Sequence, residues 1–452
     1  MTLNLVAENK GTPLHIVKLD DFQLWKDGQS TTTQKWLTQT KFSGEGLSLV
    51  PNQSGELKLA LYVVKTPEHY FGCGDLINQL PEDQYLLHCE DTYTEAVAFS
   101  WVAGGYRFEQ YKKSEKKLPV LAINDDEIVN KTNISGEATT LVRDLVNTPA
   151  GDMMPEDLAR VASELAEKFD ASLSQIVGDA LLDNNYPTIH AVGRASANKP
   201  RLIDLTWGDA DAPKVTLVGK GVCFDSGGLD LKPASGMRLM KKDMGGSAHV
   251  LGLAHMIMAH KLPINLRVLI PAVENAVSSN AMRPGDVIKT RKGLTVEIDN
   301  TDAEGRLVMC DALAEAENDD PELLIDFATL TGAMRIALGT ELPGFFSTND
   351  EIANELMVAG NKINDPVWRM PLYQPYRDLF SSKIADMTNC STIPQGAAIS
   401  AALYLQAFVK PETNWLHFDV MAWNTRHLSG RPIGGEAFGV RAMFAYLEAK
   451  YS

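Results

Sequence analysis

Two acidic side chains and one basic side chain occupy alternate positions in the segment Asn-Thr-Asp-Ala-Glu-Gly-Arg-Leu, residues 300–307. In an extended segment, side chains two positions apart leave on the same face, so Asp302, Glu304 and Arg306 would lie together. Two carboxylates on one face repel each other unless a cation lies between them, and hard divalent cations prefer carboxylate oxygens. The spacing indicates a metal site, although the same pattern also occurs on solvated surfaces.

The elements around this segment favour the metal site. Residues 294–299 alternate between apolar and polar types, which predicts a strand. Residues 307–317 have apolar side chains at helical spacing and are good helix formers. The acidic residues therefore lie at a strand-to-helix junction, where open α/β sheets bind their ligands.

A second cluster of charged residues lies upstream. The apolar run 215–218 predicts a buried strand, and Lys220 follows it between two glycines that allow close backbone approach. Asp225 precedes a Ser-Gly-Gly turn, and Lys232 comes shortly after that turn. We expect these side chains to lie at the end of a strand.

Asp243 stands directly before a run of small residues that opens a predicted helix at 245–260. Taken alone, Asp243 is equally well explained as the N-cap of that helix. We expect its neighbours Lys241 and Lys242 to lie on a solvated face.

Together Asp225, Asp243, Asp302 and Glu304 supply four carboxylates, whose charge two divalent cations would neutralise. Such centres hold their ions about 3.5–4 Å apart and activate a water molecule. Lys220 could be a ligand only in its neutral form, which burial and adjacent cations favour.

These motifs resemble those of the leucyl aminopeptidases, the cytosolic M17 metallopeptidases. The resemblance covers about residues 135–452 and extends only weakly to the N-terminal part. It is carried by the octapeptide and by the following segments in the family's order and spacing: Arg143–Ala150, Gly219–Gly221, Phe224–Gly228, Lys232, Asp243–Gly246 and Ala328–Met334.

The resemblance implies a set of protein ligands that holds two metal ions. The ions would be zinc or manganese, with magnesium or cobalt also accepted in the more exchangeable site. Asp225 and Glu304 would bridge the two ions. Asp302, with its side chain and its backbone carbonyl, would complete the coordination of one ion. Lys220 and Asp243 would complete the coordination of the exchangeable ion.

The resemblance also implies catalytic roles and a substrate pocket. Lys232 would polarise the scissile carbonyl, while Arg306 would hold a bicarbonate ion as general base for a metal-bound water. Leu330 would offer its backbone carbonyl to the peptide. Residues 389–398 lack the Gly-Arg-x-Gly-Gly-like loop expected before the predicted helix at 399–409, so the preferred N-terminal residue stays open. The substrate pocket would be lined by Met240, Thr329, Leu330, Gly332, Met421 and Asn424. Met421 and Asn424 stand where family members often have other pocket residues, which also leaves the preference open.

Strands and helices alternate along the chain after about residue 150, which predicts an α/β fold. With the resemblance, we expect two domains, a smaller N-terminal α/β domain over 1–135 and a larger catalytic α/β domain over 151–452. Residues 136–150 would form a linker helix. The catalytic domain would contain a mixed central sheet flanked by helices, and the protein would assemble as a homohexamer.

Composition narrows the range of partners. A net charge of −16 and a pI of about 5.1 disfavour nucleic acid and anionic membrane surfaces. Neither a leader peptide nor a membrane-spanning run is expected, since no apolar run approaches about 18 residues. The five scattered cysteines form no disulfide framework, which is typical of a reducing compartment, so we expect a cytoplasmic protein.

Three functions are compatible with these residues. The first is a two-metal aminopeptidase that releases the N-terminal residue of peptides. The second is a two-metal hydrolase of another class, such as a phosphoesterase, which the carboxylate count alone permits. The third is a binding or regulatory protein, since some relatives of the family bind DNA. Hydrolysis of an aminoacyl-p-nitroanilide rather than nitrophenyl phosphate separates the first two, and a salt-dependent DNA shift would favour the third.

Overall fold

The computed structural model describes residues 3–452, which divide into two compact units. The first unit contains residues up to 140 together with a return segment, residues 426–433. The second contains residues 141–425 and 434–452. The sequence predicted the change of domain at about 135 and did not indicate the return segment.

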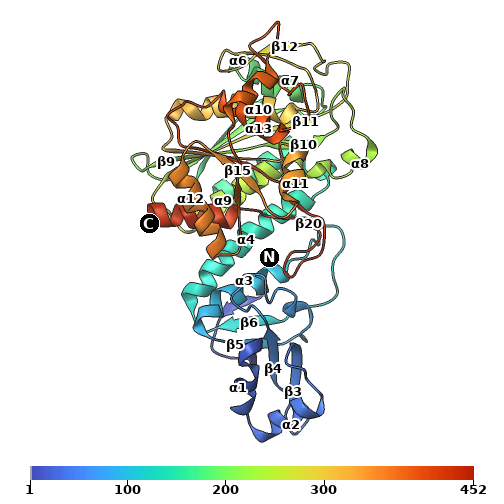
Figure 1. The fold of residues 1–452 in the computed structure, drawn as a ribbon, viewed down its shortest axis with the longest axis vertical. Helices are drawn as coiled ribbons and strands as arrows, with labels where there is room; N and C mark the ends of the chain where they lie inside the picture. The colour runs from blue at the N-terminus through green and yellow to red at the C-terminus, as the bar shows by residue number, and fades with distance from the viewer. Residues whose placement is uncertain (1–2) are drawn as a thin grey trace. The chain divides into compact units, whose positions relative to one another are not determined.

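The first unit is built on a six-stranded sheet in the order β1-β6-β5-β2-β4-β3 (Figure 1). Its strands are parallel except for the edge strand β3, which pairs antiparallel with β4. Helix α4, Asp126–Asn147, is longer than the predicted linker and belongs partly to each unit. The other elements are β1 Leu5–Ala7, β2 Thr12–Lys18, α1 Phe22–Asp27, α2 Thr31–Gln39, β3 Gly46–Pro51, β4 Leu57–Val64, β5 Gln84–His88, α3 Thr94–Gly104 and β6 Val120–Ile123.

The second unit contains a mixed nine-stranded sheet in the order β16-β15-β18-β14-β9-β11-β8-β7, with β10 paired to β11. Its four central strands β18, β14, β9 and β11 are parallel to one another. The strands are β7 Ser172–Val177, β8 Arg201–Trp207, β9 Lys214–Gly219, β10 Gly221–Asp225, β11 Asn265–Asn275, β14 Leu323–Ala328, β15 Gly344–Ser347, β16 Trp368–Arg369 and β18 Trp415–Asp419. The small sheets use β12 Val287–Lys289, β13 Thr295–Glu297, β17 Met387–Thr388, β19 Trp423–Asn424 and β20 Gly434–Gly435.

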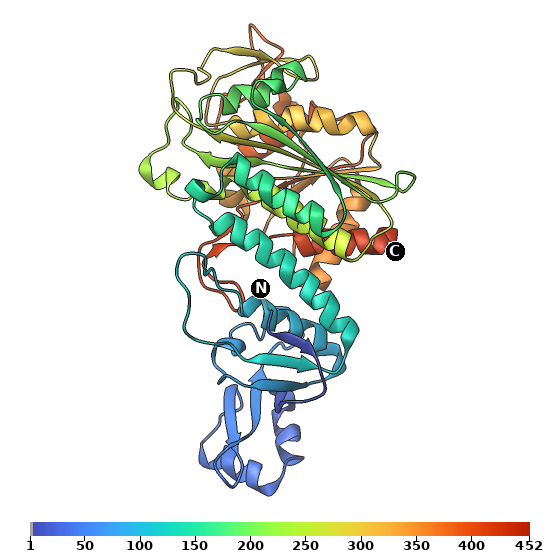
Figure 2. The same ribbon diagram turned by 180° about the vertical axis from the view of Figure 1, so that it is seen from behind.

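Helices cover both faces of this sheet, as Figures 1 and 2 show from opposite sides. One layer contains α5, α9, α12 and α14, and the other contains α7, α10 and α13. This arrangement confirms the predicted mixed α/β fold. The helices are α5 Pro155–Lys168, α6 Ala180–Asp183, α7 Pro187–Gly193, α8 Ala234–Met237, α9 Gly245–Ala259, α10 Glu304–Ala316, α11 Gly332–Leu338, α12 Asp350–Lys362, α13 Ala397–Gln406 and α14 Val440–Tyr451.

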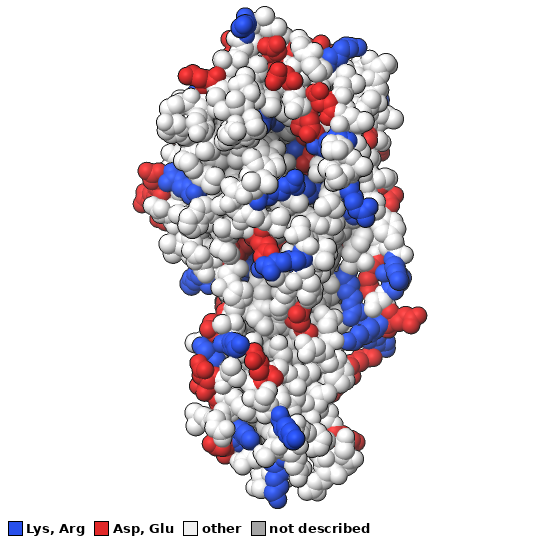
Figure 3. Space-filling model, turned by 45° about the vertical axis from the view of Figure 1, so that its right-hand side comes forward, with Lys and Arg blue, Asp and Glu red and all other residues white. Residues whose placement is uncertain are grey.

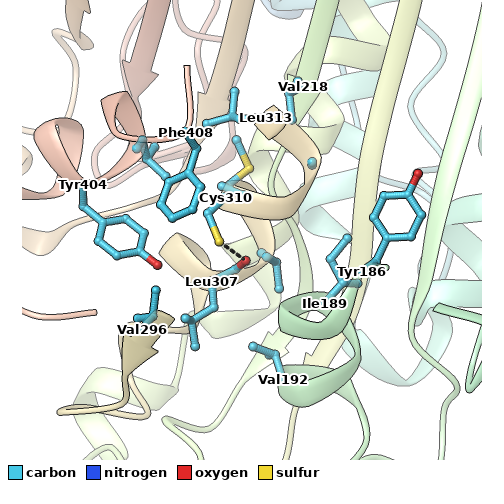
Figure 4. Packing of buried hydrophobic residues seen from close by; sticks show 14 of the residues in the cluster. Tyr186, Ile189, Val192, Val218, Val296, Leu307, Cys310, Leu313, Tyr404 and Phe408 are labelled. Atoms are coloured by element: carbon cyan, nitrogen blue, oxygen red, sulfur yellow. Dashed lines mark hydrogen bonds between the residues drawn. The ribbon is translucent and has the colours of Figure 1, made fainter. Parts of the chain in front are cut away.

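The main core of the second unit packs α7 and α13 against α10, which carries the octapeptide's helical part. Figure 4 shows Leu307, Cys310 and Leu313 of α10 between Ile189 of α7 and Tyr404 of α13. All five side chains are almost completely buried. Because burial of apolar surface is the main stabilising contribution, this packing fixes the start of α10, where Glu304 lies.

A buried ion pair joins two distant segments of the second unit. Arg143 Nε and Nη2 donate to Glu436 Oε1 and Oε2 at 3.2 and 2.9 Å, and both side chains are at most 3% exposed. Two parallel bonds satisfy both groups and fix the end of α4 against the segment after β20.

Replacing Arg143 by Met should therefore lower the free energy of unfolding by about 3–5 kcal/mol, because Glu436 would stay buried without its partner. Thermal and urea unfolding of the full chain measure this change. Arg160→Met is the matched control, since Arg160 forms only exposed pairs on α5 and its loss should cost under about 1 kcal/mol. Equal stability losses in the two variants would contradict the expectation.

Candidate functional site

The charged residues singled out in the sequence gather at the carboxyl ends of neighbouring parallel strands. Lys220 directly follows β9, and Asp225 is the last residue of β10. Thr329 directly follows β14, and Asp419 ends β18. This edge is where the strand ends of an α/β sheet place a ligand.

Asp225 is held in place by neutral donors. Its Oδ1 accepts from the Gly227 N–H and from Asn275 Nδ2, both at 2.9 Å. Asn275 Nδ2 also donates to the backbone carbonyl of Thr301 at 3.1 Å. One amide therefore joins the end of β10 to the loop that carries Asp302.

Asp243 lies in a short turn before α9 and is 3% exposed. It makes no capping bond to the helix, so the N-cap explanation is wrong. Its Oδ2 lies 2.7 Å from Lys220 Nζ, and its Oδ1 accepts from Thr329 Oγ1 at 2.8 Å. Lys220 Nζ also lies 2.9 Å from Glu304 Oε1. Burial lowers the pKa of Lys220, but Asp243 and Glu304 outweigh burial and raise it.

Lys232 bridges the other two carboxylates. Its Nζ lies 2.8 Å from Asp225 Oδ2 and 2.5 Å from Asp302 Oδ1. Burial disfavours the charged ammonium, yet Asp225 and Asp302 raise the pKa of Lys232 overall. The four carboxylates therefore face two ammonium groups.

The donor set fits divalent cations. Asp225, Asp302 and Glu304 each place a carboxylate oxygen within 4.8 Å of the others. Glu304 Oε2 is buried and, among the described residues, has no hydrogen-bond partner. Burial, and after it the Asp225 charge, raise the pKa of Glu304 well above its usual value. Lys220 and Lys232 thus do not balance the charge of the four carboxylates, and divalent cations would neutralise the remainder.

Two glycines make room for this packing. A Cβ at Gly246 would lie 2.1 Å from the carbonyl oxygen of Phe327, so no larger residue lets α9 approach β14 this closely. A Cβ at Gly305 would lie 2.8 Å from Lys220 Nζ. The small residues noted in the sequence therefore serve close packing around Lys220 and Asp243.

A cavity of about 310 Å³ opens over these carboxylates. Five of the six residues expected in the substrate pocket line it, and Asn424 does not. Asn424 is fully buried in β19. The five that line it are Met240, Thr329, Leu330, Gly332 and Met421.

Arg306 lies in the first turn of α10, does not line the cavity and is 8% exposed. Its Nη1 donates to the backbone carbonyl of Asn389 at 2.6 Å. Asn389 is buried, and its Oδ1 accepts from the backbone N–H groups of Asp299 and Asn300. Asn389, the first residue of the atypical 389–398 segment, therefore holds the octapeptide 300–307 in place through these hydrogen bonds.

Sequence reasoning missed Asn275, Asn389 and Asp419. Asp419 Oδ1 accepts from the N–H groups of Leu330 and Thr331 at 3.0 and 3.1 Å, and its Oδ2 accepts from Thr331 Oγ1 at 2.6 Å. The only signal for Asn275 and Asp419 is their place at the ends of apolar strands.

The solvated face expected for Lys242 is wrong. Lys242 lines the cavity and is 5% exposed, because the turn before α9 directs it inward. Lys241 instead extends over the ring of Trp423 and donates to the carbonyl of Asn147. Burial is the main cause that lowers the pKa of Lys242 to about 8.

Comparison with known proteins agrees with this architecture. The catalytic domain of the cytosol aminopeptidase family matches residues 140–444, and the N-terminal domain of M17 aminopeptidases matches residues 12–124. The chain belongs to the cytosol aminopeptidase family. It is therefore a metallo-aminopeptidase, as the resemblance predicted.

Individual relatives support the assignment. A probable cytosol aminopeptidase of Roseiflexus castenholzii is 40% identical over 79% of this chain and 76% of its own length. The crystal structure of a cytosol aminopeptidase from Coxiella burnetii has a TM-score of 0.95 and 47% identity, covering 99% of this chain and 100% of that one. The bottromycin maturation enzyme BotP, in complex with Mn, has a TM-score of 0.87 and 30% identity, covering 98% of this chain and 100% of that one.

Because Asn275 joins Asp225 to the Asp302 loop, Asn275→Leu should weaken the binding of Mn²⁺ by about 10–100-fold. Calorimetric titration of the EDTA-treated protein with Mn²⁺ measures the affinity. Asn280→Leu is the matched control, since Asn280 is exposed in the loop after the same strand. Equal affinities in the wild type and Asn275→Leu would show that this amide does not position the ligands.

Proposed function

We propose that this aminopeptidase releases the N-terminal residue of peptides at a centre of two divalent cations. The observation that carries the proposal is the convergence of Asp225, Asp302 and Glu304 beneath the cavity, with one buried Glu304 oxygen to which no residue within 3–452 donates.

Asp225 and Glu304 would bridge the two ions, because these two carboxylates both act to raise the pKa of Lys220 and of Lys232. Asp302 would complete the ligand set of one ion. Asp243 and Lys220 would complete that of the other, because bound cations would neutralise the carboxylates that keep Lys220 charged and so favour its neutral form. The bound ions supply Lewis acidity and lower the pKa of water. Every one of these carboxylates is then a ligand, which leaves no protein carboxylate as general base.

Lys232 would act on the substrate. Its ammonium lines the cavity and its side chain is 15% exposed, so it can reach a peptide carbonyl. Donating to that oxygen would polarise the carbonyl and stabilise the negative charge that develops there. With two cations beside Asp225 and Asp302, Lys232 would no longer be required to neutralise them.

Arg306 would hold a bicarbonate ion that accepts the proton from water. A guanidinium carries five N–H donors in a fixed fork that matches a planar oxyanion. Only Nη1 donates to Asn389 among the described residues, so further donors remain for the anion.

The N–H of Leu330 is fixed by Asp419, which leaves its carbonyl free to accept from the peptide.

The ions would be zinc or manganese, with magnesium or cobalt accepted in the exchangeable site, because carboxylate-rich sites discriminate weakly among these metals. Manganese is supported by the Mn complex of BotP. The homohexamer and the cytoplasmic location remain predictions, supported by the family and by relatives described as cytosol aminopeptidases. Within residues 3–452, no helix has both the length and the hydropathy needed to cross a bilayer.

Charge distribution agrees with a peptidase rather than a DNA-binding protein. On the face shown in Figure 3, basic and acidic side chains are interspersed, and the described residues of that face form no continuous basic area. Together with the net charge of −16, this pattern disfavours attraction of a phosphate backbone.

Metal reconstitution tests the proposed function. After EDTA treatment, Zn²⁺ or Mn²⁺ should restore hydrolysis of Leu-p-nitroanilide and should restore no hydrolysis of nitrophenyl phosphate. Lys232→Met should lower kcat by about 10²–10³-fold, the loss expected for an oxyanion donor. Asp302→Ala should fail to regain activity because one ion loses a ligand.

Lys214→Met is the matched control, because Lys214 is exposed at the opposite end of β9 from Lys220. It should retain full activity. Folded protein that hydrolyses only the phosphate ester would establish the phosphoesterase, and folded protein inactive on both would favour the binding protein.

A further inference from the structure

Lys242 is a buried cation that the candidate metal centre does not use. It lines the cavity at 5% exposure, yet no described carboxylate lies within ion-pair distance of it and no hydrogen bond satisfies its ammonium. Burying an unpaired charge is costly. The position therefore favours a negatively charged group in the cavity.

A second cation lies on the same wall. Arg335 of α11 also lines the cavity, and it has no ion pair with a described carboxylate. Its Nη1 lies 3.6 Å from Met421 Sδ, and its Nη2 would lie 3.5 Å from a Cβ at Gly332. The guanidinium is therefore folded against two residues expected to line the substrate pocket.

The acidic side chains that line the cavity either accept hydrogen bonds already or would bind the metal ions. Asp419 is the one lining carboxylate outside the four metal-site acids, and both of its oxygens accept from Leu330 and Thr331. Two divalent cations would match the charge of the other four carboxylates. Lys232, Lys242 and Arg335 would then leave the cavity with net positive charge.

We propose that Lys242 and Arg335 form a subsite for the side-chain carboxylate of an N-terminal Asp or Glu residue. This inference rests on the proposed aminopeptidase function. The cavity lining also includes Met240, Met334 and Met421, which would contact the methylene groups of such a side chain. A carboxylate would pair with both cations, whereas an N-terminal Lys or Arg would be repelled.

Isosteric substrates isolate the effect of charge. For metal-loaded protein, kcat/KM should be about tenfold or more higher for Glu-p-nitroanilide than for Gln-p-nitroanilide, as a charge-assisted hydrogen bond provides. Lys242→Met and Arg335→Met should each reduce this ratio, because the loss of kcat/KM should be larger for Glu-p-nitroanilide than for Gln-p-nitroanilide. Arg335 is exposed, so its variant tests the subsite without risk to the fold.

Lys241→Met is the matched control, because Lys241 does not line the cavity; it should retain the wild-type ratio. Calorimetry with L-glutamate and L-glutamine gives a second readout, in which glutamate should bind more tightly and lose that advantage in both variants. A ratio of one or less, or a ratio unchanged in both variants, would overturn the subsite. If no aminoacyl substrate were hydrolysed, the proposed function would fail and calorimetry alone would decide the subsite.

Discussion

Mutual repulsion among four carboxylates in one small volume is the constraint on which the second unit depends. At about 4 Å, two like charges repel by about 4 kcal/mol at an effective dielectric constant of 20, and burial adds a desolvation cost. Asp225, Asp243 and Glu304 are all at most 3% exposed, so water cannot relieve the repulsion. Lys220 and Lys232 do so only in part, since the pKa of Glu304 stays raised.

A rigid scaffold is needed to keep such groups together, and the sheet provides it. Lys220, Thr329 and Asp419 follow or end three adjacent parallel strands, whose registers are fixed by backbone hydrogen bonds. Neutral amides complete the support, because Asn275 and Asn389 hold the acidic loops without adding charge. Polar groups outside the ligand set thus orient the ligands, as is usual around metals.

The sequence predicted that Asp302 and Glu304 share one site, but Glu304 begins helix α10 rather than continuing an extended segment, and Arg306 does not line the cavity with them. The spacing of Asp302 and Glu304 and the apolar strand before Lys220 are local patterns, and they led to the correct fold class and family. Asn275 and Asp419 contact their partners only through the sheet, so no local pattern marks them. Lys242 was placed wrongly because two adjacent lysines resemble a solvated face, while the short turn before α9 points one of them inward.

The cavity combines a rigid floor with a wall that has more space. At Gly246, which lies beside Lys220 beneath the cavity lining, a Cβ would lie 2.1 Å from a backbone oxygen, so substitution would displace α9 from β14. At Gly332, on the wall, a Cβ would meet nothing nearer than the Arg335 guanidinium at 3.5 Å, an ordinary contact with a flexible side chain. Changes in the wall therefore alter which side chain fits without disturbing the carboxylates. Arg335 on this wall can accordingly set substrate preference without changing the packing around the carboxylates, whereas the charge of Lys242 also acts on the adjacent proposed ligand Asp243.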